Sequence, residues 1–153
     1  MTALASMQGL VIENQDVEVK NSTGSTIVAG DVVRFGIITA SDSATNNDQG
    51  STTSGLYLVE TVGGAETVGL FGVMLSDSTA DGAVGLCRVK GRVKAQLAAT
   101  SAAGTGLTPG TAHDLEAYSA AANEPCIALA MEVGVVGTPT YVLFDGISGM
   151  ACA

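Results

Sequence analysis

The sequence predicts an all-β protein: a compact β-barrel or β-sandwich of short antiparallel strands with Gly-rich turns. Glycine accounts for 20 of the 153 residues, well above its usual share of about 7%. Apolar residues make up 46% of the chain and aromatic residues only 4%, so Val, Ile, Leu and Ala must build the core. Short apolar runs bounded by Gly, Asn, Asp, Ser or Thr recur at near-regular spacing, which is typical of sandwiches and barrels.

Seven segments have the length and composition of strands. The first alternates polar and apolar residues, the second is rich in β-branched residues, and the others are short and mostly apolar. In chain order they are 17–20, 31–38, 56–61, 68–75, 84–97, 126–136 and 140–145. The Ala-rich stretches between the later strands contain Thr, Ser and Gly, which disfavours a long helix. A single helical turn is expected within 118–123.

The chain is predicted to form one all-β domain over 17–147, with an N-terminal arm or strand at 1–16 and a C-terminal tail at 148–153. Its 153 residues match the usual size of one domain with a real hydrophobic core. The polar, low-complexity segment 41–54 is expected to form an exposed loop or hairpin tip. The first residues lack the basic stretch of a signal peptide, so synthesis in the cytoplasm is expected.

Two parts of the sequence resemble each other in the order of their motifs. The pattern Gly-x-x-Ile/Leu-x-x-Gly occurs at 24–30 and again at 104–110, 80 residues later. An apolar strand and then a final strand follow each copy, at 71–75 and 84–91 after the first and at 127–131 and 140–146 after the second. This order indicates either a duplicated β-unit or two independent turns with the same need for glycine.

Charge and cysteine content limit the partners and cofactors of the chain. The formal net charge is −9, from 15 acidic and 6 basic residues, which disfavours nucleic acid and anionic membranes as partners. Cys87, Cys126 and Cys152 have no metal-binding spacing, and the single His cannot complete a zinc site. We expect the cysteines to be small buried apolar residues plus one terminal thiol, and we predict no metal and no cofactor.

Four of the six basic residues form an alternating row. Side chains in a strand alternate between faces, so one strand would place all four cations on one side. Like charges in such a row repel, so the row requires an anionic neighbour. That neighbour is an acidic strand of the same chain, another subunit or another protein, and a turn at Lys90-Gly91 would divide the row. The candidate protein–protein contact is Arg88, Lys90, Arg92 and Lys94.

No catalytic constellation is evident, and we predict that the protein is not an enzyme. His113-Asp114 holds the single His and lies in a polar turn, with no nucleophile-elbow motif nearby. Gly104-x-Gly106 lacks the Lys and the following helix of a phosphate-binding loop. The oxygen-rich residues around Asp42 and Asp48 lack the spacing of an EF-hand. A hydrolase that uses His113 and Asp114 remains a third hypothesis.

Four stretches of the chain, in their order and spacing, resemble the capsid decoration (cement) proteins of tailed bacteriophages and the related head-fibre bases. The stretches are VEVKNSTGSTIVAGDVVRFG at 17–36, GVMLSDSTADGAVGLCRVKGRVKA at 72–95, GTGLTPGTAHDLEAYSA at 104–120 and PCIALAMEVGVVGTPTYVLFDG at 125–146. The resemblance covers most of the chain. The sequence departs from the family pattern in the polar insert at 41–54 and at His113-Asp114, where the family favours an apolar residue.

The resemblance implies a structural protein of the virion that binds the outer surface of the capsid. Such proteins commonly form homotrimers between neighbouring major capsid proteins and stabilise the shell against the pressure of the packaged DNA. The family has no catalytic residues, so none are carried over. The alternative hypothesis is a receptor- or carbohydrate-binding β-domain of a phage fibre or surface adhesin, against which stands the absence of Trp and the low content of other aromatic residues.

Overall fold

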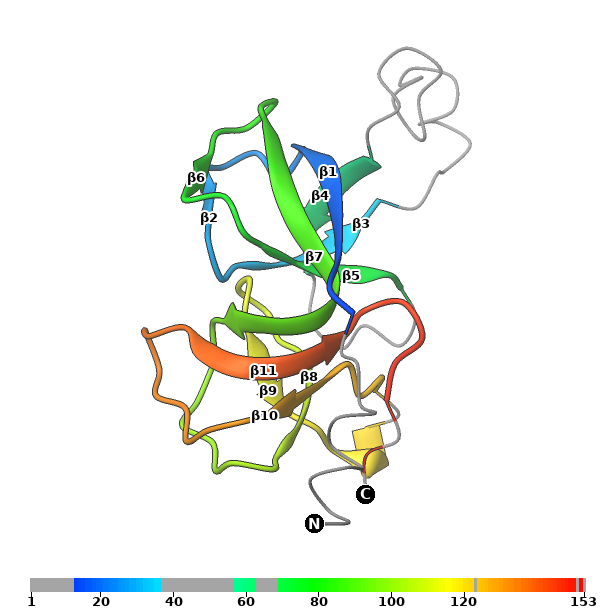
Figure 1. Cartoon of the computed structure of the whole chain (residues 1–153), viewed down its shortest axis with the longest axis vertical. Coiled ribbons are helices and arrows are strands. Elements are labelled where there is room, and N and C mark those ends of the chain that lie inside the picture. Colours follow the sequence, from blue (N-terminus) through cyan, green and yellow to red (C-terminus); the bar gives the residue numbers. More distant parts are fainter. Residues whose placement is uncertain (1–12, 37–56, 63–68, 123, 151, 153) are drawn as a thin grey trace.

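The computed structural model describes residues 13–36, 57–62, 69–122, 124–150 and 152 (Figure 1). Within these ranges the structure is almost entirely β, and η1 (Ala120–Ala122), a 3-10 helix, lies within the expected helical turn. The strands are β1 (Gln15–Asn21), β2 (Ile27–Val28), β3 (Val32–Phe35), β4 (Tyr57–Thr61), β5 (Phe71–Met74), β6 (Ser78–Thr79), β7 (Val84–Ala95), β8 (Gly106–Pro109), β9 (Leu115–Ala117), β10 (Ala128–Ala130) and β11 (Thr140–Asp145). The predicted all-β fold is confirmed, and it is built from barrels.

The first barrel is a closed ring of five strands in the order β1-β4-β3-β5-β7, completed by the pairing of β1 with β7. The β1–β4 pair is parallel and the other pairs are antiparallel. A two-stranded ribbon of β2 and β6 lies beside it at the upper left of Figure 1. The side chains packed inside the first barrel are Val19, Ile27, Val33, Val59, Met74 and Cys87.

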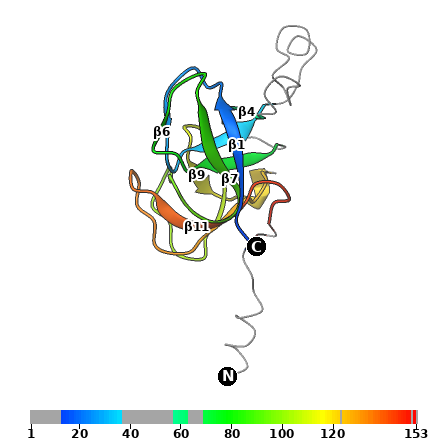
Figure 2. The same ribbon diagram turned by 45° about the horizontal axis from the view of Figure 1, so that its top comes forward.

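The second barrel contains the C-terminal half of β7, followed by β11, β10, β8 and β9. An isolated parallel bridge between Leu97, just after β7, and Leu115 in β9 closes this ring. Figure 2 shows the same separation into two groups of strands from a second direction, with β6 in one group and β11 in the other. The larger hydrophobic cluster, which includes Leu107, Ile127 and Phe144, fills the second barrel.

β7 belongs to both barrels, and it changes direction between them (Figure 1). Buried and exposed positions alternate along all twelve residues, so the strand is continuous across Lys90-Gly91. Gly91 has φ of +117°, a backbone conformation that side chains disfavour. A Cβ atom at Gly91 would contact Oδ1 of Asn14 and would come within 3.0 Å of its Cα. Glycine therefore permits both the bend and the close approach of the residues that lead into β1.

Neighbouring residues of β3 and β5 connect the two hydrophobic cores. Val33 and Met74 point into the first barrel, whereas Val32 and Val73 belong to the cluster that fills the second. Both faces of these strands are therefore buried, and the barrels share a wall instead of being joined by a linker. The backbone of His113 reinforces this junction, because its carbonyl accepts a hydrogen bond of 2.8 Å from the amide of Val32.

The sequence predictions for individual strands hold where a strand is long or strongly apolar. The predicted strand at 126–136 is wrong in length, because β10 ends at Ala130 and the following residues form the turn of the β10–β11 hairpin. The short strands β2, β6, β8 and β9 have no predicted counterpart. The predicted loop at 41–54 and residues 1–12 of the predicted arm lie outside the described residues.

The two copies of the suspected repeat lie in different barrels. The first copy contributes β2, β3, β5 and the start of β7, and the second contributes β8 to β11. The pairs β5–β7 and β10–β11 correspond, because both are antiparallel pairs at equivalent places in the repeat, although β6 separates the strands of the first pair. The glycine-flanked segments differ, since Ile27 pairs with β6 whereas Leu107 pairs with β10.

The cysteine prediction is correct for the burial of Cys87 and Cys126, and it is wrong for the terminal thiol at Cys152. Cys87 is buried and free. Cys126 and Cys152 form a disulfide bond with their Cα atoms 5.9 Å apart. In the predicted C-terminal tail, the amide of Met150 also donates a hydrogen bond to the carbonyl of Cys126. Within the described part of the chain, no helix is long and apolar enough to cross a membrane.

The cysteine arrangement leads to a direct chemical prediction. Burial, with a smaller contribution from the charge of Asp16, raises the pKa of the Cys87 thiol to about 12. We expect a thiol reagent at pH 8 to modify none of the cysteines in the folded protein, because the thiolate is the reactive form. In denaturant without reductant one thiol should react, and three should react after reduction. Three reactive thiols without reductant would contradict the disulfide.

Candidate protein-binding face

The predicted basic row exists as one face of one strand. Arg88, Lys90, Arg92 and Lys94 all occupy β7, and the residues between them are buried. The two halves of the row nevertheless have different neighbours. Arg88 and Lys90 lie where β7 leaves the first barrel, and Arg92 and Lys94 lie on the outside of the second.

Arg88 and Lys90 are paired with carboxylates of the same chain. The guanidinium of Arg88 donates two hydrogen bonds to Asp16 of β1, with nitrogen–oxygen distances of 2.7 and 3.0 Å. These hydrogen bonds raise the pKa of Arg88 above its ordinary value. Lys90 lies 3.6 Å from the carboxylate of Asp145 at the end of β11. The anionic neighbours of this half of the row are therefore acidic residues on adjacent strands, one of the alternatives left open by the sequence.

Arg92 and Lys94 have an aromatic neighbour instead of an acidic one. The guanidinium carbon of Arg92 lies 4.1 Å from the centre of the Tyr141 ring, and the ammonium nitrogen of Lys94 lies 4.8 Å from it. These distances correspond to cation–π contacts. No carboxylate among the described residues forms an ion pair with either cation. Both charges thus stay available to a partner while the ring holds the side chains in place.

Apolar side chains continue this surface across the second barrel. Leu143 of β11 pairs with Arg92 of β7, and Leu129 of β10 pairs with Leu143. The amide of Met131 donates a hydrogen bond to the carbonyl of Tyr141, which places Met131 in the adjacent row. Leu129 and Met131 are exposed. We call this surface the basic face; its members are Arg92, Lys94, Tyr141, Leu143, Leu129 and Met131.

Several residues of the basic face belong to types that are common in protein interfaces. Tyr, Met and Arg are enriched in such interfaces, and exposed apolar residues supply the area that binding removes from water. The hairpin between β10 and β11 adds three more exposed apolar residues beside it: Val133, Val135 and Val136. An exposed apolar surface next to two unpaired cations favours a partner that presents apolar and acidic groups together.

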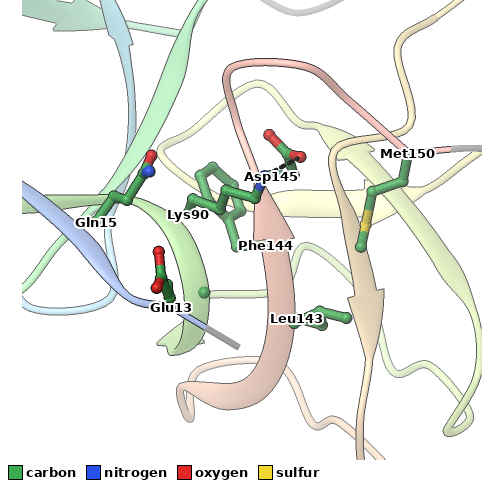
Figure 3. A pocket seen from close by; sticks show the side chains of 8 residues that line it. Glu13, Gln15, Lys90, Leu143, Phe144, Asp145 and Met150 are labelled. Atoms are coloured by element: carbon green, nitrogen blue, oxygen red, sulfur yellow. Dashed lines mark ion pairs between the residues drawn. The ribbon is translucent and has the colours of Figure 1, made fainter. Parts of the chain in front are cut away.

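A hollow of about 320 Å³ lies where β1, β7 and β11 meet. Figure 3 shows the ion pair of Lys90 with Asp145 across this hollow, with Glu13 and Met150 on opposite sides. The remaining lining residues are Gln15, Gly91, Leu143 and Phe144. The Lys90 ammonium and the Asp145 carboxylate are the oppositely charged pair that faces this hollow.

A smaller apolar groove of about 190 Å³ lies beside the first barrel. In this groove the rings of Phe35 and Tyr57 pack edge to face. Their centres are 5.8 Å apart and their planes form an angle of 85°. Tyr57 is 53% exposed, so its ring is open to a ligand. The other lining residues are Val17, Leu70, Val89 and Ile147.

The structure does not bring His113 and Asp114 together as a catalytic pair. Nδ1 of His113 lies 3.1 Å from the carbonyl oxygen of Val32 and donates a hydrogen bond to it. Oδ1 of Asp114 is buried without a hydrogen-bond partner in the part of the chain that the structure describes. His113 has φ of 60° in a tight turn. Its evident role is to join this turn to β3, which does not support the hydrolase hypothesis.

The other sequence motifs also have structural roles or lie outside the described residues. Gly104 has φ of +86° and provides the turn before β8. The acidic residues around Asp42 and Asp48 fall in 37–56, which the structure does not describe. In the described ranges no group of three or more His, Cys, Asp or Glu side chains is placed to hold a metal ion.

Sequence patterns identify the cations of the basic face but not the aromatic and apolar residues beside them. Arg92 and Lys94 stand out because they alternate with apolar residues. Tyr141 and Leu143 alternate with buried Val142 and Phe144 in the same way. That alternation predicts an outward position but not the strand beside which they lie. Only the register of β11 against β7 places the Tyr141 ring under the two cations.

Comparison with known proteins identifies a shared fold. No protein-family model matches the chain, and no curated protein matches it in sequence. Its structure is similar to the crystal structure of the N base of head fiber gp8.5 of bacteriophage phi29, with a TM-score of 0.58 and 8% sequence identity. The alignment covers 92% of this chain and 100% of that chain. At this level of identity, the similarity shows that the two chains share a fold.

The two internal ion pairs should differ in strength. In Arg88–Asp16 the side chains are partly buried and two hydrogen bonds join them, so a double-mutant cycle with Ala should give a coupling energy of about 1 kcal/mol. For Lys90–Asp145 the coupling should stay below about 0.5 kcal/mol, because Lys90 is half exposed and 3.6 Å away. Denaturant unfolding measures both values. Equal couplings would show that the bidentate geometry does not set the strength.

Proposed function

We propose that the protein is a structural component of a phage virion that binds the outer surface of the capsid and cements neighbouring major capsid proteins. The carrying observation is the fold shared with the phi29 head fiber base over 92% of the chain. The sequence resemblance to capsid decoration proteins and head-fibre bases supports the same role. The proposed role is non-catalytic, the proposed assembly is a homotrimer, and the proposed partner is the major capsid protein.

The shared barrel wall suits this role physically. A cementing protein must transmit force between subunits without internal rearrangement, and two barrels with interlocked cores behave as one body. The basic face offers apolar area together with charge, and many identical copies multiply the effect of each contact. The cations of β7 would then lie at a contact with another subunit or with the capsid.

Co-sedimentation with capsids tests the proposed function. Purified protein is mixed with expanded capsids of its source phage, and unexpanded shells serve as the control. We expect saturable binding to expanded shells only, because a cementing site is formed by capsid proteins in their expanded arrangement. The plateau gives the copy number per shell. Absence of binding to either shell would refute the capsid role.

One observation favours a second candidate function, a carbohydrate- or receptor-binding domain of a phage fibre. Tyr57 is exposed at the apolar groove beside Phe35, and an accessible aromatic ring is what a sugar face stacks on. A glycan array with wild-type protein and the Tyr57→Ala variant tests it. This candidate predicts binding that the variant loses, with the Tyr118→Ala variant as a control outside the groove. An array without binding would remove it.

A further inference from the structure

The exposed side of β7 has two ends of different chemical character. Its C-terminal end carries Arg92 and Lys94 of the basic face. Its N-terminal end carries Val84 and Leu86, which are 53% and 40% exposed. Both pairs point outward from the same strand. The N-terminal end presents apolar side chains, whereas the C-terminal end presents two cations next to the apolar residues of the basic face.

Two exposed carboxylates flank the apolar end of β7. Glu18 lies directly opposite Leu86 in the β1–β7 ladder. On the other side, the hydroxyl of Ser76 accepts a hydrogen bond of 2.8 Å from the amide of Leu86, which places the next residue, Asp77, beside this end. Neither carboxylate forms an ion pair with a cation of the described residues. We call Val84, Leu86, Glu18 and Asp77 the acid-flanked patch.

One cation, Lys20, borders this patch, which leaves two carboxylates against one ammonium. Lys20 lies opposite Val84 in the same ladder, but it is partly buried and interacts within its own chain. The patch therefore presents two apolar side chains with two free carboxylates. The basic face presents apolar side chains with two cations held by Tyr141. The two surfaces are complementary, because both present apolar side chains and their charges are opposite.

The net charge of −9 limits how copies of the chain can meet. Acidic surfaces repel one another within the screening distance of about 8–10 Å at ordinary ionic strength. Two copies therefore attract where cations of one face acidic groups of the other. We propose that the basic face of one copy binds the acid-flanked patch of a second copy, so that copies associate head to tail along β7.

Such a contact uses different surfaces on the two partners. A head-to-tail contact, made once between two copies, leaves one free surface of each type at every step, so the copies close into a ring or extend into an open chain, whereas reciprocal exchange of both surfaces would close a two-fold dimer. The inference deepens the proposed function, because it names the surfaces through which copies on a capsid would contact each other. It concerns the purified protein alone, so it can fail while capsid binding stands.

Charge reversal at each surface, followed by exchange of both, tests the contact. The first variant is Arg92→Glu with Lys94→Glu, the second is Glu18→Lys with Asp77→Lys, and the third combines all four changes. The association constant is measured by sedimentation velocity across a concentration series at low and high salt. A control variant, Glu116→Lys with Glu124→Lys, carries the same net charge change as the second at residues outside both surfaces.

We expect the wild type to associate, and each double variant to associate at least about tenfold more weakly. The combined variant should regain association, because the charges are exchanged between the surfaces and the net charge equals that of the wild type. The control should associate like the wild type. Association should weaken at high salt.

A monomeric wild type, or a first variant that associates like the wild type, would overturn the contact. A folded combined variant that stays monomeric would also overturn it, with circular dichroism as the check of folding. The capsid assay keeps the two proposals separate. A wild type that binds shells as a monomer supports the proposed capsid binding, and refutes both the homotrimer and the head-to-tail contact. A wild type that self-associates but binds no shell refutes the proposed function and leaves the head-to-tail contact standing.

Discussion

Both barrels depend on the unbroken alternation of side chains along β7. Every second residue of this strand is buried, and the buried set serves the first core at Cys87 and the second at Val93 and Ala95. A shift of one residue would move the cations into the cores and the apolar residues into water. Gly91 allows the strand to turn from one barrel to the other without interrupting that alternation. The architecture thus follows from one long strand with a strict two-residue period and one glycine.

The electrostatics of the molecule follow from the same alternation. A strand that buries its apolar residues must carry its cations on the other side, where they repel one another. Asp16 and Asp145 neutralise the half of the row at the junction between the barrels. The other half is stabilised by the Tyr141 ring, which leaves the positive charges exposed. The chain therefore keeps positive charge at one place on a strongly acidic molecule, and that place is rich in apolar surface.

Local patterns in the sequence predict the all-β fold, the longer strands and the orientation of the cations. They do not predict the disulfide, because a separation of 26 positions between Cys126 and Cys152 matches no motif. Strands of two residues, such as β2 and β6, carry too little periodicity to be recognised. The joining of two barrels depends on pairings between distant residues, such as Val19 with Tyr57. The position of Tyr141 beneath the cations depends on register in the same way.

The bond between Cys126 and Cys152 also determines how the molecule bears mechanical load. It closes a covalent loop that contains β10 and β11. Tension applied at the last residues enters the fold at Cys126, beside β10, and bypasses β11. The ladder between β11 and β7 therefore cannot be unzipped from the C-terminal end while the bond is intact. A chain anchored by that end would therefore yield first outside the covalent loop, in the segments that precede Cys126.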